Sequence, residues 1–277
     1  MSNPIATPLV EDVDTGELDG LIRLHTHPDG AVTVTLNKPV MSGATAAALT
    51  EAFETLHGAD HVRIVFIRGP GGAFCAGLDH ARFKVAATDW SEADLRNEGE
   101  LLAGMLKALT AVPALTVALV QGEAVGMGVG LAAACDLAVA TRDARFALSE
   151  ATTGAAGWLA APFVVNAIGP RQAKALFATG RVFDAAYAER IGLVQELVED
   201  ADGLNAAAER LTEQALATGP AAVAESKRMV WDVWDKVQDH ALIREIAHRF
   251  AQSRFSEEGR EGLTAVLEGR RPNWTAD

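Results

Sequence analysis

The chain has 277 residues, of which 49% are hydrophobic, so it can bury one large α/β core, alone or with a small helical appendage. Its formal net charge of −13 excludes a nucleic-acid partner held by phosphate neutralisation, because no segment supplies a basic stripe. Cys75 and Cys135 lie far apart in apolar contexts, so we expect no disulfide framework, no CxxC metal or redox site and a reducing, cytoplasmic setting. No signal-peptide pattern or membrane-spanning apolar run is visible, so we expect no membrane partner. Residues 1–20 are acidic and are expected to form a flexible tail.

The first half of the chain predicts strands that alternate with helices. In chain order the expected elements are a β-hairpin over residues 21–37, a helix over 44–58, a strand over 61–69, a helix over 91–109, a strand over 114–120, and a small-residue helix that passes into a strand over 130–141. Pro28-Asp29-Gly30 supplies the hairpin turn, and Ser91, followed by acidic residues, is the expected N-cap of the second long helix. After Phe146 the patterns are mostly helical and are interrupted by Gly and Pro, which predicts a helical last third.

The segment "LVQGEAVGMGVGLAAACD", from Leu119 to Asp136, places glycines at 126, 128 and 130 at the entrance to a buried helix. The spacing fits neither a dinucleotide-binding fingerprint nor a P-loop, because the third fingerprint glycine and the Gly-Lys-Ser/Thr are both missing. Close helix packing would explain the small residues. A second glycine-rich strand exit, "RGPGGAFCAGLDH", favours a different explanation, in which each exit directs one backbone N–H at the same oxyanion.

Four segments together resemble the enoyl-CoA hydratase/isomerase (crotonase) superfamily: "FIRGPGGAFCAGLD", "VQGEAVGMGVGLAAACDLAVAT", "RFALSE" and "EGLTAVLEGRRPNW". The resemblance implies an α/β fold, a spiral of ββα turns over residues 21–200, and a helical C-terminal region over 201–277 that forms trimers or dimers of trimers. It also implies a coenzyme A thioester substrate, with coenzyme A arriving as part of the substrate and no separate cofactor. By motif, the backbone N–H groups of Leu78 and Met127 are expected to form the oxyanion hole, although Met127 stands where the family usually has glycine.

The same resemblance assigns the proton carrier. Hydratases of this superfamily commonly carry two glutamates; the first position matches Gly130 here, so that carboxylate is missing, and the second matches Glu150. Without the resemblance, Glu150 would be taken for a surface or capping residue. Glu123 is expected to be a surface charge of the loop.

Further contacts to coenzyme A or substrate are expected on resemblance. They are assigned to Lys38, Ala76, Gly77, Gly126 and Trp158. Trp158 is either a wall of the acyl pocket or ordinary core packing. Arg82 and Lys84 are weaker candidates for the phosphates of coenzyme A. No metal site is expected.

A single carboxylate leaves two reactions open. It can move one proton between C2 and C4, which is double-bond isomerisation, or it can pass both parts of a water molecule across a conjugated double bond. The residues alone slightly favour the isomerase. The finer resemblance of residues 130–150 and 160–194 to methylglutaconyl-CoA hydratases leans toward hydration, and hydration of a 2-enoyl-CoA is the expectation we adopt. A catalytically weak acyl-CoA-binding protein is the third possibility.

Overall fold

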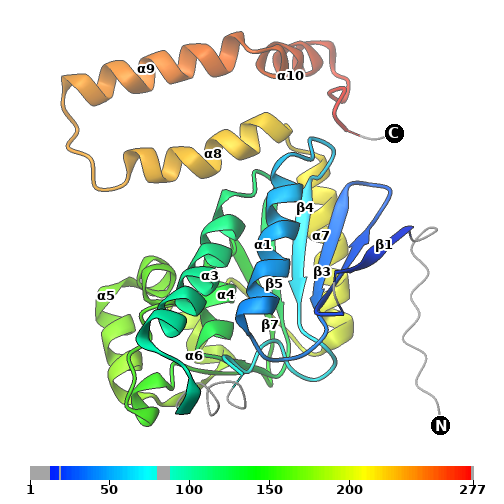
Figure 1. Ribbon diagram of the computed structural model, residues 1–277. Coiled ribbons are helices and arrows are strands. Elements are labelled where there is room, and N and C mark those ends of the chain that lie inside the picture. The colour runs from blue at the N-terminus through cyan, green and yellow to red at the C-terminus, as the bar shows by residue number, and fades with distance from the viewer. Residues whose placement is uncertain (1–12, 19, 80–87, 276–277) are drawn as a thin grey trace.

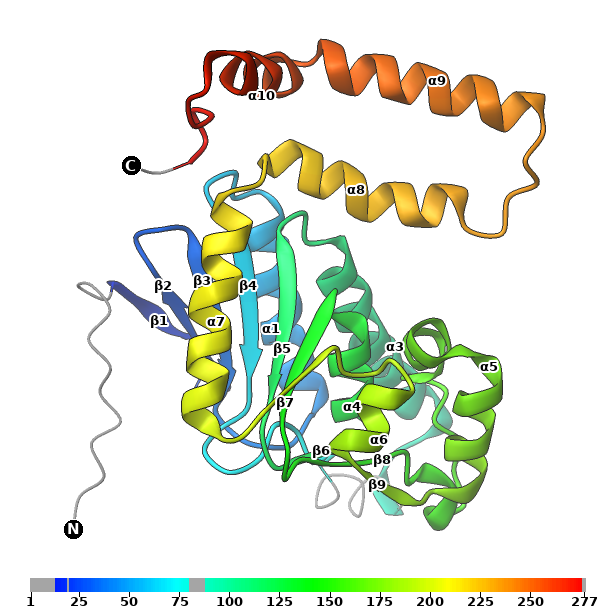
Figure 2. The same cartoon turned by 180° about the vertical axis from the view of Figure 1, so that it is seen from behind.

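The computed structural model describes residues 13–18, 20–79 and 88–275 of the chain. Its centre is a seven-stranded sheet in the order β1-β2-β3-β4-β5-β7-β10 (Figures 1 and 2). The strands are β1 (Val13–Leu18), β2 (Ile22–Thr26), β3 (Ala31–Leu36), β4 (Ile64–Arg68), β5 (Leu115–Val120), β7 (Leu137–Thr141) and β10 (Glu196–Val198). The first three are antiparallel, and β3 to β10 run parallel. Arg82 and Lys84 lie outside the described residues.

The predicted hairpin is confirmed, because β2 and β3 pair in antiparallel register and the Asp29 carboxylate accepts a hydrogen bond from the Ala31 amide at 3.0 Å. Gly30 takes a φ of 88°, a left-handed conformation that glycine adopts without strain.

Helices cover both faces of the large sheet. On one face lie α1 (Gly43–His57) and α3 (Glu92–Ala111), and on the other lies α7 (Ala201–Leu216) (Figures 1 and 2). Strand residues therefore alternate between two cores: in β4, Val65 and Ile67 join the core under α1 and α3, whereas Ile64 and Phe66 join the core under α7. The expected N-cap is confirmed, since Ser91 and Asp94 form a reciprocal capping box at the start of α3.

A second, three-stranded sheet lies at the carboxyl end of the central strands. It has the order β6-β8-β9, with β6 (Glu123–Val125), β8 (Arg145–Ala147) and β9 (Val182–Asp184). Around it lie α4 (Met127–Ala134), the 3₁₀ helix η1 (Glu150–Thr153), α5 (Ala161–Thr179) and α6 (Ala185–Arg190). The expectation of mostly helix after Phe146 missed β9 and β10, because a strand of three residues is too short to show alternation.

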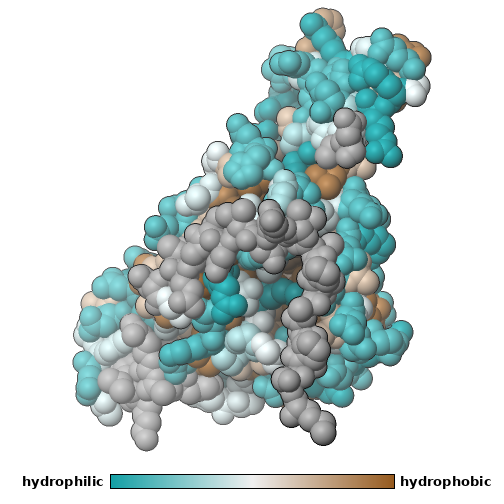
Figure 3. All heavy atoms as spheres, turned by 90° about the vertical axis from the view of Figure 1, so that its right-hand side faces the viewer, coloured by the Kyte–Doolittle hydropathy of each residue, from teal (hydrophilic) through white to brown (hydrophobic). Residues whose placement is uncertain are grey.

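The last helices, α8 (Pro220–Val233), α9 (His240–Phe255) and α10 (Glu257–Glu268), form an arm at the end of the molecule opposite the small sheet (Figure 1). Figure 3 shows this arm standing apart from the body, with a mostly polar surface on that side. Lys227 of α8 ties it to the body through a 2.6 Å ion pair with Asp136 and a 2.7 Å hydrogen bond to the Val112 carbonyl. Asp136 also accepts from the Thr116 amide at 2.8 Å, a structural role.

The arm exposes large apolar side chains. Among them are Trp231, which is 57% exposed, and Trp234, which is 67% exposed, so neither belongs to the core of the single chain. In the part of the chain that the structure describes, no helix combines the length and the apolar character needed to cross a membrane.

Candidate active site

The first glycine-rich segment, residues 69–79, follows β4 and pairs with the residues that lead into α1. The amide of Met41 donates to the carbonyl of Gly77 at 2.8 Å, and the amide of Asp79 donates to the carbonyl of Met41 at 2.9 Å. Because the peptide between Gly77 and Leu78 is trans, the Leu78 N–H points away from the Gly77 carbonyl and therefore away from Met41. Within the described residues nothing accepts a hydrogen bond from this N–H, so it can donate to a ligand.

The second glycine-rich segment is the tight connection from β6 into α4. Gly126 takes φ 52° and ψ −109°, a conformation that residues with a side chain rarely adopt. The helix begins at Met127, whose N–H lies in the first turn, where amides have no intrahelical partner and the helix dipole is positive. Of the described residues, none accepts a hydrogen bond from this N–H. Met127 is 2% exposed, and its side chain packs in the core under α1 and α3, so it does not cover the N–H.

The two segments touch each other. The amide of Val125 donates to the carbonyl of Cys75 at 2.9 Å. A Cβ atom on Gly77 would lie 2.9 Å from the Val125 carbonyl oxygen, and a Cβ on Gly128 would overlap the Cys75 carbonyl. These glycines are therefore required by the close approach of two backbones, and the approach brings the Leu78 and Met127 segments to one place.

Glu150 reaches the same place from β8. This strand pairs in parallel with β6, and the Gly126 amide donates to the Ala147 carbonyl at 2.8 Å, so the residues after β8 emerge beside the start of α4. A Cβ on Gly126 would lie 2.7 Å from Glu150 Oε1. The other carboxylate oxygen, Oε2, is buried and has no hydrogen-bond partner among the described residues. Since buried polar atoms are normally paired, this oxygen marks a place where a ligand or water would be bound.

The space next to Gly130 is filled. A Cβ added to Gly130 would lie 2.8 Å from Ala160 Cβ and 3.6 Å from a methyl carbon of Leu106. The absence of a side chain at Gly130 therefore leaves no empty space in which a second carboxylate could stand.

The other predicted contact residues lie around this centre. Lys38 is exposed, and the carbonyl of the next residue, Pro39, accepts from the Ala76 amide at 2.6 Å, which places Lys38 beside the loop that carries Leu78. Trp158 is 80% exposed, so it is not core packing. Whether it lines an acyl pocket stays a prediction.

Sequence reasoning missed two residues that shape the surroundings of Glu150. A Cβ on Gly157 would lie 3.3 Å from the Glu150 carboxyl carbon and 2.5 Å from a ring carbon of Phe177. No periodic pattern in the sequence marks Gly157 and Phe177 as neighbours of Glu150.

Cys75 lies behind the first glycine corner and is fully buried. Burial raises the pKa of its thiol to about 11, so the group is a neutral thiol near pH 7 and a poor nucleophile. In the described ranges, no group of three or more His, Cys, Asp or Glu residues is arranged to hold a metal ion.

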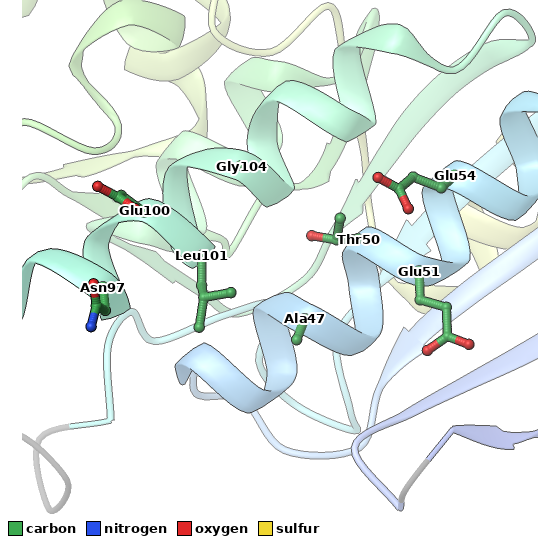
Figure 4. A pocket seen from close by; sticks show the side chains of 8 residues that line it. All are labelled: Ala47, Thr50, Glu51, Glu54, Asn97, Glu100, Leu101 and Gly104. Carbon is green, nitrogen blue, oxygen red and sulfur yellow. The ribbon is translucent and has the colours of Figure 1, made fainter. Parts of the chain in front are cut away.

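A surface pocket of about 550 Å³ lies elsewhere, between α1 and α3 (Figure 4). Its lining residues are Ala47, Thr50, Glu51, Glu54, Asn97, Glu100, Leu101 and Gly104. None of the predicted site residues lines it, and its carboxylates would repel the phosphates of coenzyme A. We therefore place the candidate active site at the two glycine corners and not in this pocket.

Comparisons with known proteins identify the family and the fold of the chain. The family model described as enoyl-CoA hydratase/isomerase matches residues 26–277. The chain is 31% identical to the mitochondrial enoyl-CoA hydratase domain-containing protein 2 of Bos taurus, over 90% of this chain and 85% of that protein. It is 28% identical to the mevalonyl-coenzyme A hydratase sidH of Aspergillus fumigatus, over 87% of this chain and 90% of that protein.

A solved structure of an enoyl-CoA hydratase from Mycobacterium smegmatis superposes with a TM-score of 0.85 at 32% identity, over 92% of this chain and 99% of that chain. The chain thus has the crotonase fold, and it belongs to the enoyl-CoA hydratase/isomerase family, whose members act on acyl-CoA thioesters.

Proposed function

We propose that the protein is an enoyl-CoA hydratase that adds water across the C2–C3 double bond of a 2-enoyl-CoA thioester. The observation that carries the proposal is the Glu150 carboxylate, with one oxygen packed against the Gly126 turn at the start of α4 and the other buried without a partner. A carboxylate in such a position can hold a water molecule and exchange a proton with it.

In the proposed reaction the thioester oxygen accepts hydrogen bonds from the N–H groups of Leu78 and Met127. Glu150 takes a proton from water as the water oxygen bonds to C3, and the electrons of the double bond move onto the thioester oxygen as an enolate. Glu150 then returns the proton to C2, which restores the carbonyl. In this proposal the two amides stabilise the enolate, because donors that are fixed before the reaction need no reorganisation as the charge develops.

A Δ3,Δ2-enoyl-CoA isomerase is the second candidate, and the packing at Gly130 favours it. Ala160 occupies the space beside Gly130, so no second carboxylate can stand there to hold the water. Isomerisation needs one group that removes a proton from C2 and returns it to C4, and Glu150 alone can do this.

Incubation with crotonyl-CoA, 3-methylglutaconyl-CoA and a 3-enoyl-CoA separates the two candidates through the absorbance of the conjugated thioester. We expect loss of conjugation with at least one 2-enoyl substrate. Gain of conjugation from the 3-enoyl substrate alone would establish the isomerase instead. Binding without any change would indicate an acyl-CoA-binding protein.

The proton carrier is tested by Glu150→Gln, which we expect to lower kcat by about 10²-fold or more. The matched control is Glu123→Gln, because Glu123 is an exposed glutamate on β6, the strand that pairs with β8. Turnover of Glu150→Gln at a rate near that of Glu123→Gln would show that another group moves the proton.

We also propose that the protein is a homotrimer or a dimer of trimers. The support is the arm, on which Trp231, Trp234, Ile246, Phe250 and Val266 are each about half exposed or more in the single chain. Apolar surface of this extent normally marks an interface. Sedimentation velocity should give a mass three or six times that of one chain, and a monomer would refute the proposal.

A further inference from the structure

Helix α3 carries a buried carboxylate that is not part of the candidate active site. Glu98 is 6% exposed, and its Oε1 accepts a hydrogen bond from the amide of Gly43, the first residue of α1, at 2.6 Å. A Cβ on Gly43 would lie 2.6 Å from the Glu98 carboxyl carbon, so only glycine admits the carboxylate this close. Burying a charge is unfavourable unless it is well paired, so this contact needs an explanation.

The start of α1 gives the carboxylate a suitable partner. Ser42 caps the helix by accepting from the Thr45 amide, but α1 has no acidic residue in its own first turn. Glu98 therefore supplies from another helix the negative charge that a helix N-terminus favours, and its hydrogen bond to a backbone amide is charge-assisted.

The start of α1 is also the support of the Leu78 peptide. Met41, two residues before Gly43, holds the Gly77 carbonyl at 2.8 Å and accepts from the Asp79 amide at 2.9 Å. The direction of the Leu78 N–H follows from the first of these bonds, because the N–H points opposite to the Gly77 carbonyl. A displacement of the start of α1 would thus displace this N–H.

We propose that Glu98 is a positioning residue for the oxyanion hole: it holds the start of α1 through Gly43, and so fixes Met41 and the direction of the Leu78 N–H. This inference rests on the proposed function, in which the Leu78 N–H binds the thioester oxygen. Misplacement of a catalytic group by about 1 Å can cost about 10²-fold in rate, so a small shift of α1 is enough to matter.

The test compares Glu98→Ala and Glu98→Gln, with Glu100→Ala as the matched control, since Glu100 is an exposed glutamate on the same helix. We expect Glu98→Ala to lower kcat by about tenfold or more with little change in KM, because binding of the remote coenzyme A moiety is untouched. Glu98→Gln, whose amide oxygen can accept the same bond from Gly43, should recover most of the rate. Glu100→Ala should match the wild type.

A second readout does not depend on turnover. A bound 4-(dimethylamino)cinnamoyl-CoA absorbs at longer wavelength when hydrogen bonds polarise its thioester carbonyl. We expect a red shift in the wild type and Glu98→Gln, and a smaller shift in Glu98→Ala. If Glu98→Ala does not fold, Glu98→Asp replaces it, because the shorter side chain cannot reach Gly43 from the same backbone position.

The two readouts separate the possible failures. A folded Glu98→Ala variant that keeps the full red shift and the wild-type kcat, and has only a lower Tm, would overturn the positioning role and leave the proposed function standing. Absence of a red shift in the wild type would instead refute the oxyanion hole itself. A wild type that shifts the probe but does not hydrate enoyl-CoA would refute hydration and leave the positioning role intact.

Discussion

The proposed oxyanion hole consists of backbone groups, so its sharpest test removes a backbone N–H. Met127→Pro does this at the first position of α4, where proline is well tolerated because its fixed φ suits the start of a helix. Gly126, at φ 52° and ψ −109°, lies close to the mirror image of the extended region that precedes proline, and glycine adopts such mirror-image conformations without strain. The helix should therefore form in the variant.

The matched control is Met127→Ala, which loses the same buried side chain but keeps the N–H. Because Met127 is 2% exposed, each variant should lose about 2–5 kcal/mol of unfolding free energy through the cavity that it leaves. Their difference in activity isolates the amide: removal of one oxyanion donor costs about 10²–10³-fold in kcat, which is about 3–4 kcal/mol.

The measurement is kcat on the best 2-enoyl-CoA substrate, at a temperature where both variants are folded by circular dichroism. We expect Met127→Pro to be at least about 10²-fold slower than Met127→Ala, with similar affinity for a saturated acyl-CoA. Equal kcat values for the two folded variants would refute the role of this N–H and with it the assignment of the glycine corners.

Three further predictions use other features of the fold. Gly126→Ala should abolish activity, because it combines left-handed strain with a clash against the carboxylate of Glu150, the proposed proton carrier. Gly154→Ala, at φ 79° with open space around it, should show the strain alone in thermal unfolding and keep its activity. Burial raises the pKa of the Cys75 thiol from 9.0 to about 11, so its contribution to stability is present below pH 9 and is lost as the pH rises toward 11. Cys75→Ala lacks this group. Between pH 9 and pH 11 its unfolding free energy, measured in urea, should therefore fall by about 2 kcal/mol less than that of the wild type. Lys227→Met should destabilise the chain by about 2–3 kcal/mol in urea, since it leaves Asp136 half-buried without its cation, and an unchanged midpoint would show that the ion pair does not hold the arm.

The sequence predicts well those features that local chemistry decides. The hairpin turn at Asp29-Gly30 and the cap at Ser91 each depend on residues within three positions of each other, and both are present. Helix α1 ends at His57, directly before Gly58, as the position of this glycine predicts. The two glycine-rich segments were located in the same way, because glycines between an expected strand and an expected helix indicate a turn; Gly77 and Gly126 take φ 93° and 52° there.

Features that depend on contacts between distant segments were not predicted. The strands β8, β9 and β10 have three residues each, too few to show alternation. Strand β8 pairs with β6 and β9, and β10 pairs with β7, so each depends on segments that are distant in the sequence. Glu98 shares a helix stripe with Leu102, Met105 and Leu109, so its burial could have been inferred from spacing, but its partner Gly43 is 55 positions away and no local signal points to it.

The sequence shows only that Gly130 carries no carboxylate. The packing around Gly130 adds that no water can take the place of the missing side chain. If that position were simply trimmed, a water molecule could occupy the vacated space and be held there independently of Glu150. Ala160 instead lies against Gly130, so in hydration we expect Glu150 and the reacting thioester to hold the water. One carboxylate must then both take the proton and return it, and it can reach only one face of the double bond. The hydroxyl group and the proton derived from water would consequently be added to the same face, so that in D₂O the deuterium at C2 would lie syn to the new hydroxyl.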